Sequence, residues 1–328
     1  MRRYLERELL RGWYGSRWWT QVLAPLGHGV SLATRVRRRR RNRTRPPVPV
    51  VVVGNITVGG TGKTPLVAAL VEEARRHGLR PVVISRGHGA RGGAFPREVD
   101  PAGSAAEYGD EPLLLARDTG VPVIIDPDRC RALSHALETR APDIIFSDDG
   151  LQHYRLPRSV EIVVIDAARG LGNGRCLPAG PLREPRRRLR EVDHVVVNGD
   201  NSAWPGTVAM MLQWGDPVSI ADGASLTLED FRQRYPRINA LAGIGNPKRF
   251  FDALARAGFV VVEARALPDH HVPRPSELDF EARLPVVMTA KDAVKVPAGL
   301  ADGWYIPARA QLPQPFLDRL FSSLEQEQ

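Results

Sequence analysis

One segment constrains the fold of this 328-residue chain more than any other: the glycine-rich sequence Gly59–Thr64, which reads Gly-Gly-Thr-Gly-Lys-Thr. It lies between the valine-rich run Val48–Val53, typical of a buried parallel strand, and residues 65–77, which we expect to be helical. Glycines let a backbone wrap around a phosphate, and the amides at the start of a helix point toward it. The segment therefore predicts a P-loop.

The residues after the last glycine indicate what this loop would bind. Lys63 is expected to reach the β- and γ-phosphates, and the Thr64 hydroxyl to ligate Mg²⁺, so the predicted cofactors are ATP and Mg²⁺. A plain connecting turn would not explain these two side chains. The predicted nucleotide-binding residues are Thr57, Val58, Gly59, Gly60, Thr61, Gly62, Lys63 and Thr64, although the usual P-loop pattern has glycine at the position of Thr57.

Apolar runs recur along the chain and alternate with segments that could be helical. They predict strands at 81–84, 121–125, 143–146 and 161–165, and then at 194–197, 239–242, 259–263, 285–289 and 304–307. This alternation predicts an α/β fold with a P-loop (Rossmann-like), doubly wound, mainly parallel sheet and a second, smaller α/β domain. We expect an amphipathic helical segment at 1–45, the nucleotide-binding core at 46–170, and the second domain with its hinge at 171–328.

The N-terminal segment carries an apolar helical stripe followed by arginines. The stripe consists of Trp19, Val22, Leu23, Leu26 and Val30, and the dense basic block Arg35–Arg45 comes next. The run is too short to span a bilayer, but this order suits peripheral contact with an anionic membrane. The alternative is a helical pair packed on the protein's own core. The net charge of +9 fits anionic partners, but no basic and aromatic repeat follows, so no nucleic-acid partner is expected.

A pair of carboxylates follows one predicted strand. Asp148 and Asp149 follow residues 143–146 after Ser147, where a P-loop protein needs its metal ligand. Adjacent carboxylates repel unless a cation compensates them, so Asp148, Asp149 and Thr64 are the predicted metal ligands. Gln152 and His153 follow closely and could orient water or phosphate oxygens, or cap the chain locally.

Phosphorylating a hydroxyl also requires a group that accepts its proton. The sequence offers two candidates, Asp110-Glu111 before an apolar helix and Asp269-His270-His271 in the second unit. A helix N-cap would also explain the first. Arg183 lies on a proline-flanked turn suited to gripping a phosphate, although ordinary turn chemistry is the alternative. Lys291 and Lys295 form a further candidate cluster or a solvated face.

Together these motifs resemble the tetraacyldisaccharide 4′-kinase family over nearly the whole chain. The matching segments are Gly54–Pro65, Ser85–Gly87, Gly109–Pro112, Asp148–His153, Leu177–Pro185, Gly243–Pro247, Asp269–His271 and Thr289–Lys295.

The resemblance implies transfer of the ATP γ-phosphate to the 4′-hydroxyl of an acylated glucosamine disaccharide 1-phosphate, giving lipid IV-A in lipid A biosynthesis. It implies a location at the cytoplasmic face of a bacterial inner membrane, and we expect the chain to be a monomer. It also implies that Asp110 is the base and His270 its partner from the second domain, while Arg183 and Lys63 contact phosphate.

Rival classes each lack a diagnostic residue. A P-loop GTPase would carry Asn-Lys-x-Asp where the chain reads Asn198-Gly199-Asp200, and a partitioning ATPase would carry lysine in place of Val58. A kinase of a soluble small molecule fits the residues and is disfavoured mainly by the resemblance and the N-terminal segment.

Overall fold

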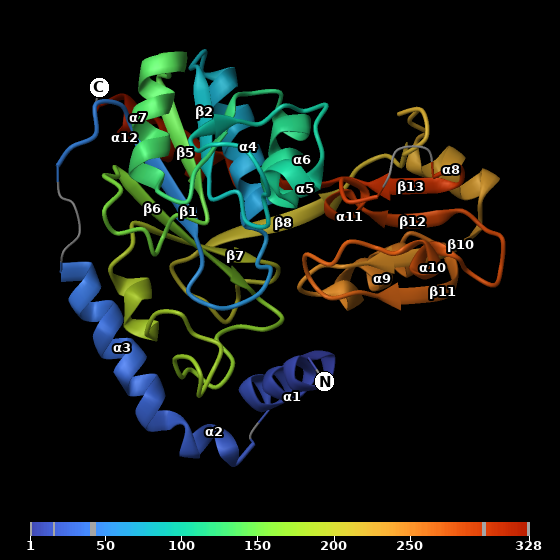
Figure 1. The fold of residues 1–328 in the computed structure, drawn as a ribbon, viewed down its shortest axis with the longest axis horizontal. Coiled ribbons are helices and arrows are strands. Elements are labelled where there is room, and N and C mark those ends of the chain that lie inside the picture. The colour runs from blue at the N-terminus through green and yellow to red at the C-terminus, as the bar shows by residue number, and fades with distance from the viewer. Residues whose placement is uncertain (1, 16, 40–43, 297–299, 327–328) are drawn as a thin grey trace.

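The chain folds into two α/β domains (Figure 1). Two segments connect them: the chain passes into the smaller domain through one and returns to the larger domain through the other. The computed structural model describes residues 2–15, 17–39, 44–296 and 300–326, with the backbone alone for residues 2–7. Residues 40–43 of the predicted basic block lie outside the described residues.

In the described part of the chain, nine strands form the larger sheet, in the order β14-β8-β7-β6-β1-β5-β2-β4-β3. The strands from β8 to β4 are parallel, whereas β14 and β3 are antiparallel edges. The bounds are β1 Val50–Gly54, β2 Pro81–Ser85, β3 Arg97–Glu98, β4 Val123–Ile125, β5 Ile144–Asp148, β6 Val160–Asp166, β7 His194–Asn198, β8 Val208–Trp214 and β14 Ala308–Gln311.

Helices cover both faces of this sheet, which confirms the predicted doubly wound fold. Alternate valines of β1 point to opposite layers: Val51 and Val53 pack against α4, α6 and α12, whereas Val50 and Val52 pack against α7. This alternation follows from the two-residue period of a strand. The bounds are α4 Lys63–Arg76, α5 Ala105–Tyr108, α6 Asp110–Thr119, α7 Arg129–Arg140, the short 3₁₀ helix η1 Arg186–Arg190 and α12 Gln314–Glu325.

The smaller domain is built on a five-stranded sheet in the order β11-β10-β12-β13-β9, parallel except at β9. Phe231, Phe250 and Leu254 from α8 and α9 fill one face, and residues 267–296 supply most of the apolar side chains on the other. The bounds are β9 Val218–Ser219, β10 Arg237–Ala242, β11 Val260–Ala266, β12 Val286–Thr289, β13 Gly303–Ile306, α8 Leu228–Arg234, α9 Pro247–Arg256, α10 Pro275–Leu278 and α11 Ala290–Ala293.

The boundary between the domains differs from the one expected after residue 170. Strands β7 and β8 extend the larger sheet by parallel pairing, and the chain returns from the smaller domain to form β14 and α12 of the larger one. The two connections meet where Gly215 N donates a hydrogen bond to Pro307 O at 2.9 Å. An apolar run predicts a strand but not the sheet that the strand joins, so the sequence could not place this boundary.

The N-terminal helices α1 (Arg2–Tyr14), α2 (Trp19–Val22) and α3 (Ala24–Arg39) lie along one flank of the larger domain (Figure 1). Their inner side is anchored: Trp13 Nε1 donates to Pro178 O at 2.9 Å, and a Cβ added at Gly27 would lie 2.8 Å from Cys176 O. Their outer side is apolar and exposed, with Val22 66% and Leu26 59% accessible. Neither predicted alternative therefore describes the whole segment, because one side packs on the protein and the other does not.

Candidate active site

Two buried asparagines support the backbone of the P-loop through side-chain hydrogen bonds. Asn55 Nδ2 donates to Gly59 O at 3.1 Å, and Asn198 Nδ2 donates to Thr61 O at 2.9 Å. Gly62 has φ +98°, and a Cβ there would lie 2.5 Å from Asn198 Nδ2, so only glycine fits. Helix α4 then begins at Lys63, which turns its first amides toward the loop. This geometry is that of a phosphate-binding site.

Lys63, Asp149 and Arg183 meet beside the loop. Lys63 Nζ lies 3.4 Å from Asp149 Oδ1, and Arg183 Nη1 lies 3.4 Å from Asp149 Oδ2. Burial alone would raise the pKa of the Asp149 carboxyl, but the charges of Lys63 and Arg183 bring it down to about 2. Asp149 is therefore ionised at neutral pH, between two cations that could also contact phosphate.

Backbone pairing explains how Arg183 reaches this place. Arg183 N donates to Ile56 O at 2.7 Å, and Val58 N donates to Pro181 O at 2.9 Å. The segment around Leu182 thus pairs with the chain that enters the P-loop, through a bridge to Thr57. Thr57 is buried and takes part in this pairing, which gives a structural role to the residue that departs from the usual pattern.

The buried carboxylate of Asp148 is the best candidate for a cation ligand. It is fully inaccessible at the end of β5, and within the described part of the chain neither of its oxygens has a hydrogen-bond partner. Burial raises the pKa of this carboxyl, with Glu111 adding to the effect. Unpartnered carboxylate oxygens within reach of the charge of Lys63 fit Mg²⁺, which prefers oxygen ligands.

Gln152 and His153 point to different neighbours. Gln152 Nε2 donates to Asn55 O at 3.0 Å and to Glu184 Oε1 at 2.8 Å, so it braces the chain leading into the P-loop. His153 Nε2 lies 3.4 Å from Asp128 Oδ1 at the N-cap of α7. The structure therefore keeps Gln152 next to the P-loop chain and places His153 beside another helix.

The two candidate proton acceptors meet across the domain gap. His270 Nδ1 lies 3.0 Å from both Oδ1 and Oδ2 of Asp110, the first residue of α6. Burial would raise the pKa of the Asp110 carboxyl, but the hydrogen bond from His270 and the charge of Lys291 lower it to about 2. The same hydrogen bond raises the pKa of His270. Spacing alone offered these residues as two candidates and the resemblance implied that they pair; in the structure they are in contact.

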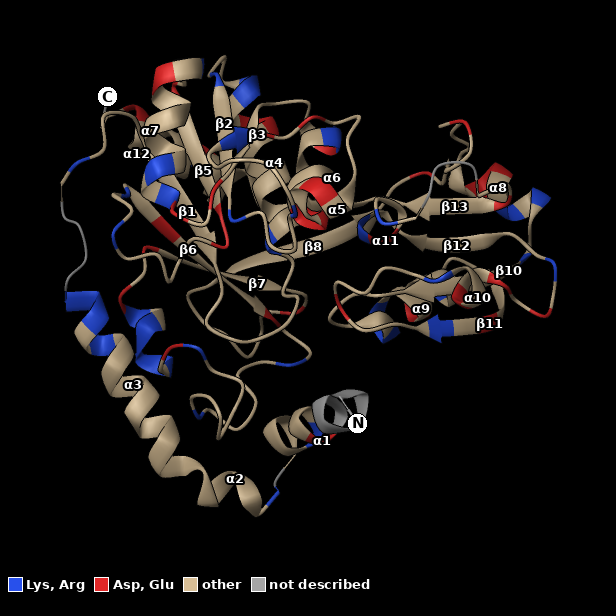
Figure 2. Cartoon of the chain, viewed as in Figure 1, with Lys and Arg blue, Asp and Glu red and all other residues tan. Residues whose placement is uncertain are grey.

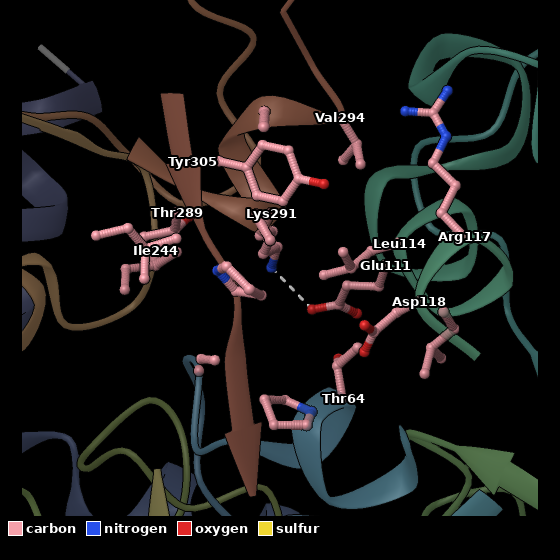
Figure 3. A pocket seen from close by; sticks show the side chains of 18 of the residues that line it. Thr64, Glu111, Leu114, Arg117, Asp118, Ile244, Thr289, Lys291, Val294 and Tyr305 are labelled. Carbon is pink, nitrogen blue, oxygen red and sulfur yellow. Dashed lines mark hydrogen bonds and ion pairs between the residues drawn. The ribbon is translucent and has the colours of Figure 1, made fainter. Parts of the chain in front are cut away.

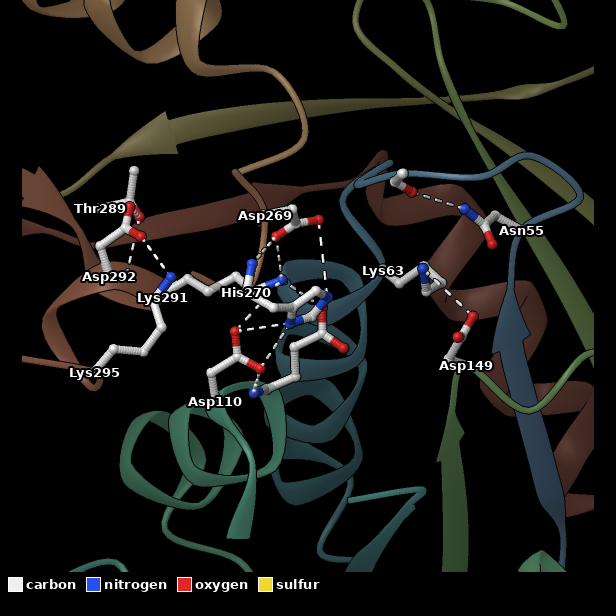
Figure 4. A network of polar contacts seen from close by, with 12 residues as sticks. Asn55, Lys63, Asp110, Asp149, Asp269, His270, Thr289, Lys291, Asp292 and Lys295 are labelled. Carbon is white, nitrogen blue, oxygen red and sulfur yellow. Dashed lines mark hydrogen bonds and ion pairs between the residues drawn. The ribbon is translucent and has the colours of Figure 1, made fainter. Parts of the chain in front are cut away.

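Lys291 does not lie on a solvated face. Its Nζ lies 2.8 Å from Glu111 Oε1 and 3.0 Å from Asp269 Oδ1, and its side chain is only 15% exposed. Lys295 is buried as well, 2.7 Å from Asp292 Oδ1. Figure 4 shows Lys291, Asp269, His270 and Asp110 converging, with Lys63 and Asp149 to one side of them.

A cleft of about 1010 Å³ runs between the two domains and contains the outer face of the P-loop. Figure 3 shows Thr64 and Glu111 from the larger domain opposite Lys291 and Tyr305 from the smaller one. The backbones of the two domains come close together at Gly245, where an added Cβ would lie 2.5 Å from Gly60 N. The volume and the P-loop lining suit a nucleotide.

A sequence model of the tetraacyldisaccharide-1-P 4′-kinases (LpxK) matches residues 19–325, which include both domains and α2 and α3. The chain belongs to this family. It is therefore a kinase, and the resemblance carried by its motifs is confirmed.

Curated relatives and a solved structure agree with this assignment. The chain is 51% identical over 313 residues to the tetraacyldisaccharide 4′-kinase of Alcanivorax borkumensis, covering 94% of this chain and 95% of the relative. It is 51% identical over 265 residues to the enzyme of Pseudomonas aeruginosa PAO1, covering 80% and 79%. The crystal structure of LpxK from Aquifex aeolicus in complex with ATP superposes with a TM-score of 0.76 at 27% identity, covering 93% of this chain and 99% of that one.

Several residues of this kinase site escaped the sequence analysis. Asn55, Asn198 and Glu184 support the P-loop or its neighbours through buried hydrogen bonds. Arg249 reaches from α9 to Asn198 Oδ1 at 2.7 Å and so joins the two domains. Only their positions in the sequence could have indicated these residues. Asn198 directly follows the predicted strand 194–197, and Asn55 and Glu184 lie within the segments that resemble the kinase family.

Proposed function

We propose that this kinase transfers the γ-phosphoryl group of ATP to the 4′-hydroxyl of a tetraacyldisaccharide 1-phosphate, producing lipid IV-A. The observation that carries the proposal is the Asp110–His270 pair, whose chain neighbours Glu111 and Asp269 line the same cleft as the P-loop. In a chain of this family, that arrangement supplies a phosphate donor site and a proton acceptor in one chamber. Both halves come from one chain, so the proposed active form is a monomer.

The proposed roles follow from the chemistry of each side chain. Asp110 accepts the proton of the acceptor hydroxyl. At the same time the hydroxyl oxygen bonds to the γ-phosphorus of ATP, and the bond from that phosphorus to ADP breaks. His270 donates a hydrogen bond to Asp110 and keeps the carboxylate ionised and oriented. Lys63 and Arg183 stabilise the charge on the phosphate oxygens.

Mg²⁺ would be held by Asp148, Asp149 and Thr64, and when bound it would neutralise charge on the β- and γ-phosphates. The P-loop backbone from Thr57 to Thr64 would cradle those phosphates. Glu111, Gln152 and His153 support this site from outside: Glu111 through Lys291, Gln152 through Asn55, and His153 through α7.

The acceptor's acyl chains suggest where the reaction occurs. The outer side of α2 and α3 exposes Trp18, Val22, Leu26, Leu32 and Val36, and within α3 the basic residues gather at the C-terminal end (Figure 2). None of the described helices combines the length and apolar character needed to cross a bilayer. We propose peripheral attachment to the anionic cytoplasmic face of the inner membrane, with the apolar side chains at the interface.

Transfer of radiolabel from [γ-³²P]ATP to a tetraacyldisaccharide 1-phosphate in detergent micelles tests the proposal. Lys63→Ala and Asp110→Asn should each lower the rate of lipid labelling by about 100-fold or more, because each removes a group acting in the transition state. Lys248→Ala, at an 82% exposed side chain of the smaller domain, is the matched control and should keep the wild-type rate. ATP turnover without labelled lipid would remove the acceptor assignment.

A further inference from the structure

We propose that Lys291 is a positioning residue that clamps the proton-accepting pair across the domain gap. It joins the loop carrying His270, in the smaller domain, to the first turn of α6, in the larger domain. The inference rests on the proposed role of Asp110 as the base. It extends that role by assigning the part that holds the base and its partner in place.

The contacts of Lys291 define the clamp. Its ammonium lies 2.8 Å from Glu111 Oε1, 3.0 Å from Asp269 Oδ1 and 3.8 Å from Asp110 Oδ2. Two of these carboxylates belong to α6, and the third belongs to the residue before His270. A compact ammonium with three donors can serve three acceptors that converge from two domains. Lysine is also rare here, with four lysines among the 46 Lys and Arg residues, which fits a position that requires a compact point charge.

The charges around the pair explain why a cation is needed. Asp110, Glu111 and Asp269 place three carboxylates close together in a largely buried site. Without Lys291 their mutual repulsion would push the domains apart or favour protonation of one carboxyl. The charged or titratable groups around Asp110 are His270, Asp269, Lys291 and Lys295 from the smaller domain, with Glu111 on α6 and His88 stacked edge-on against His270.

The backbone that carries Lys291 is fixed to the domain behind it. Asp292 accepts hydrogen bonds from Thr289 Oγ1 at 2.6 Å and from Gly243 N at 2.9 Å, and Lys295 pairs with its other oxygen at 2.7 Å. Gly243 begins the loop whose Gly245 meets the P-loop at Gly60. The Gly245 contact and Lys291 are therefore carried by one connected part of the smaller domain, so we expect contact with the P-loop and assembly of the base to be coupled.

Lys291 also supports a strained turn. His270 has φ +61°, a left-handed conformation that is costly for a residue with a side chain. Asp269 Oδ1 accepts a hydrogen bond from His270 N at 3.1 Å and contacts Lys291 Nζ at 3.0 Å. The lysine thus holds the carboxylate that stabilises this turn, and the turn aims the imidazole at Asp110.

The test compares Lys291→Met, which removes the charge and keeps the length, with Lys291→Arg, which keeps the charge. Lipid phosphorylation is measured from pH 4 to 9, together with the KM for ATP and the Tm of each variant. Lys291→Met should lower kcat by about 10- to 100-fold, as expected when a catalytic group is misplaced, with a smaller change in KM for ATP. Losing the positive charge raises the pKa of Asp110, so the acid limb of the profile should move to higher pH. Lys291→Arg should recover part of both effects.

Matched variants separate this inference from the proposed function. Lys248→Met is the control, because that exposed lysine pairs only with Asp252 on its own helix in the described structure. Glu111→Gln removes one carboxylate contact of Lys291 without changing Asp110, and it should lower kcat as Lys291→Met does.

Three outcomes would contradict the inference. If Asp110→Asn is inactive while Lys291→Met keeps the wild-type kcat and pH profile, the clamp alone is overturned. An active Asp110→Asn would overturn the base assignment and the clamp together. A Lys291→Met variant that loses activity only in proportion to its unfolded fraction would also contradict the clamp.

Discussion

At the scale of single residues, the site is a set of charges whose protonation is set by their neighbours. Burial favours the neutral form of Asp110, yet the hydrogen bond from His270 and the charge of Lys291 outweigh it, and the pKa falls to about 2. His270 gains in turn, because its hydrogen bond to Asp110 raises its own pKa. A carboxylate ionised throughout the physiological range is thereby available to accept a proton.

Replacing His270 should therefore alter the pH dependence of the enzyme. In His270→Gln the pKa of Asp110 rises, since the cationic donor is lost while burial remains, so the acid limb of kcat/KM should move to higher pH. His271→Gln is the neighbouring control, because His271 Nε2 contacts Glu277 at 2.6 Å instead of Asp110. An unchanged profile in His270→Gln would contradict the pairing.

The same pair predicts a window of stability. Asp110, with its pKa lowered, stabilises the fold above its unfolded pKa of about 3.9, and this contribution is lost as the pH falls through the folded value. His270, with its pKa raised, stabilises the fold below about 6.5, and this contribution is lost as the pH rises through the folded value. The difference in unfolding free energy between wild type and His270→Gln should therefore be largest between about pH 4 and 6.5.

At the scale of elements, the N-terminal helices have two dissimilar sides. One side packs on residues 171–182 through Trp13, Gly27 and Val30, and the other exposes Val22 and Leu26. A helix stripe is normally the side that packs on the core. Here Trp13, Gly27 and Val30 make the contacts with the protein, so the exposed side chains of Val22 and Leu26 can contact a lipid surface.

The double variant Val22→Ser with Leu26→Ser should weaken binding to vesicles. Each buried apolar side chain contributes about 1.5 kcal/mol or more, so losing both should lower partitioning onto phosphatidylglycerol-containing vesicles by about 100-fold or more. Val260→Ser is the control, since Val260 is 57% exposed on β11 of the smaller domain. Sedimentation with the vesicles measures the effect, and equal binding of both variants would contradict the membrane role of α2 and α3.

At the scale of the whole molecule, the two domains complete the site only when they are close together. The larger domain contributes the P-loop, Asp148, Asp149 and Asp110, and the smaller one contributes His270 and Lys291. The backbone contact between Gly60 and Gly245 leaves no room for a side chain. We therefore expect domain closure to exclude water around the reacting groups and to position them at the same time.

Gly245→Val should block this closure. Its Cβ would lie 2.5 Å from Gly60 N, so kcat should fall about 100-fold, as expected for a displacement of about 1 Å at the catalytic groups. Ala255→Val, at an exposed position of α9 in the same domain, adds similar bulk and should leave kcat unchanged. Small-angle scattering with ATP should show a more open Gly245→Val enzyme, and wild-type kcat in that variant would contradict the closure model.

Much of the molecule was predictable from local signals. The P-loop, its flanking strand and helix, and the paired Asp148 and Asp149 at a strand end were all apparent from residue types and spacing. Each follows from short-range chemistry. Valines favour a buried strand, glycines allow a tight loop, and the amides at the start of a helix attract an anion. Strands β8 and β14 and helix α12 were not predicted, because their patterns are less regular and their partners lie far along the chain.

The sequence by itself determined the fold class, the phosphate-binding loop and the family, since these depend on residues that act through their near neighbours. Only the tertiary structure showed that Asp110 and His270 are in contact, as the family resemblance implied, and that Lys291 lies among three carboxylates instead of on a solvated face. It also decided where the larger domain ends. These features depend on contacts between residues far apart in the sequence: Asp110 and His270 are 160 positions apart, and Glu111 and Lys291 are 180 apart. Such contacts exist only once both sheets have formed and the domains have met.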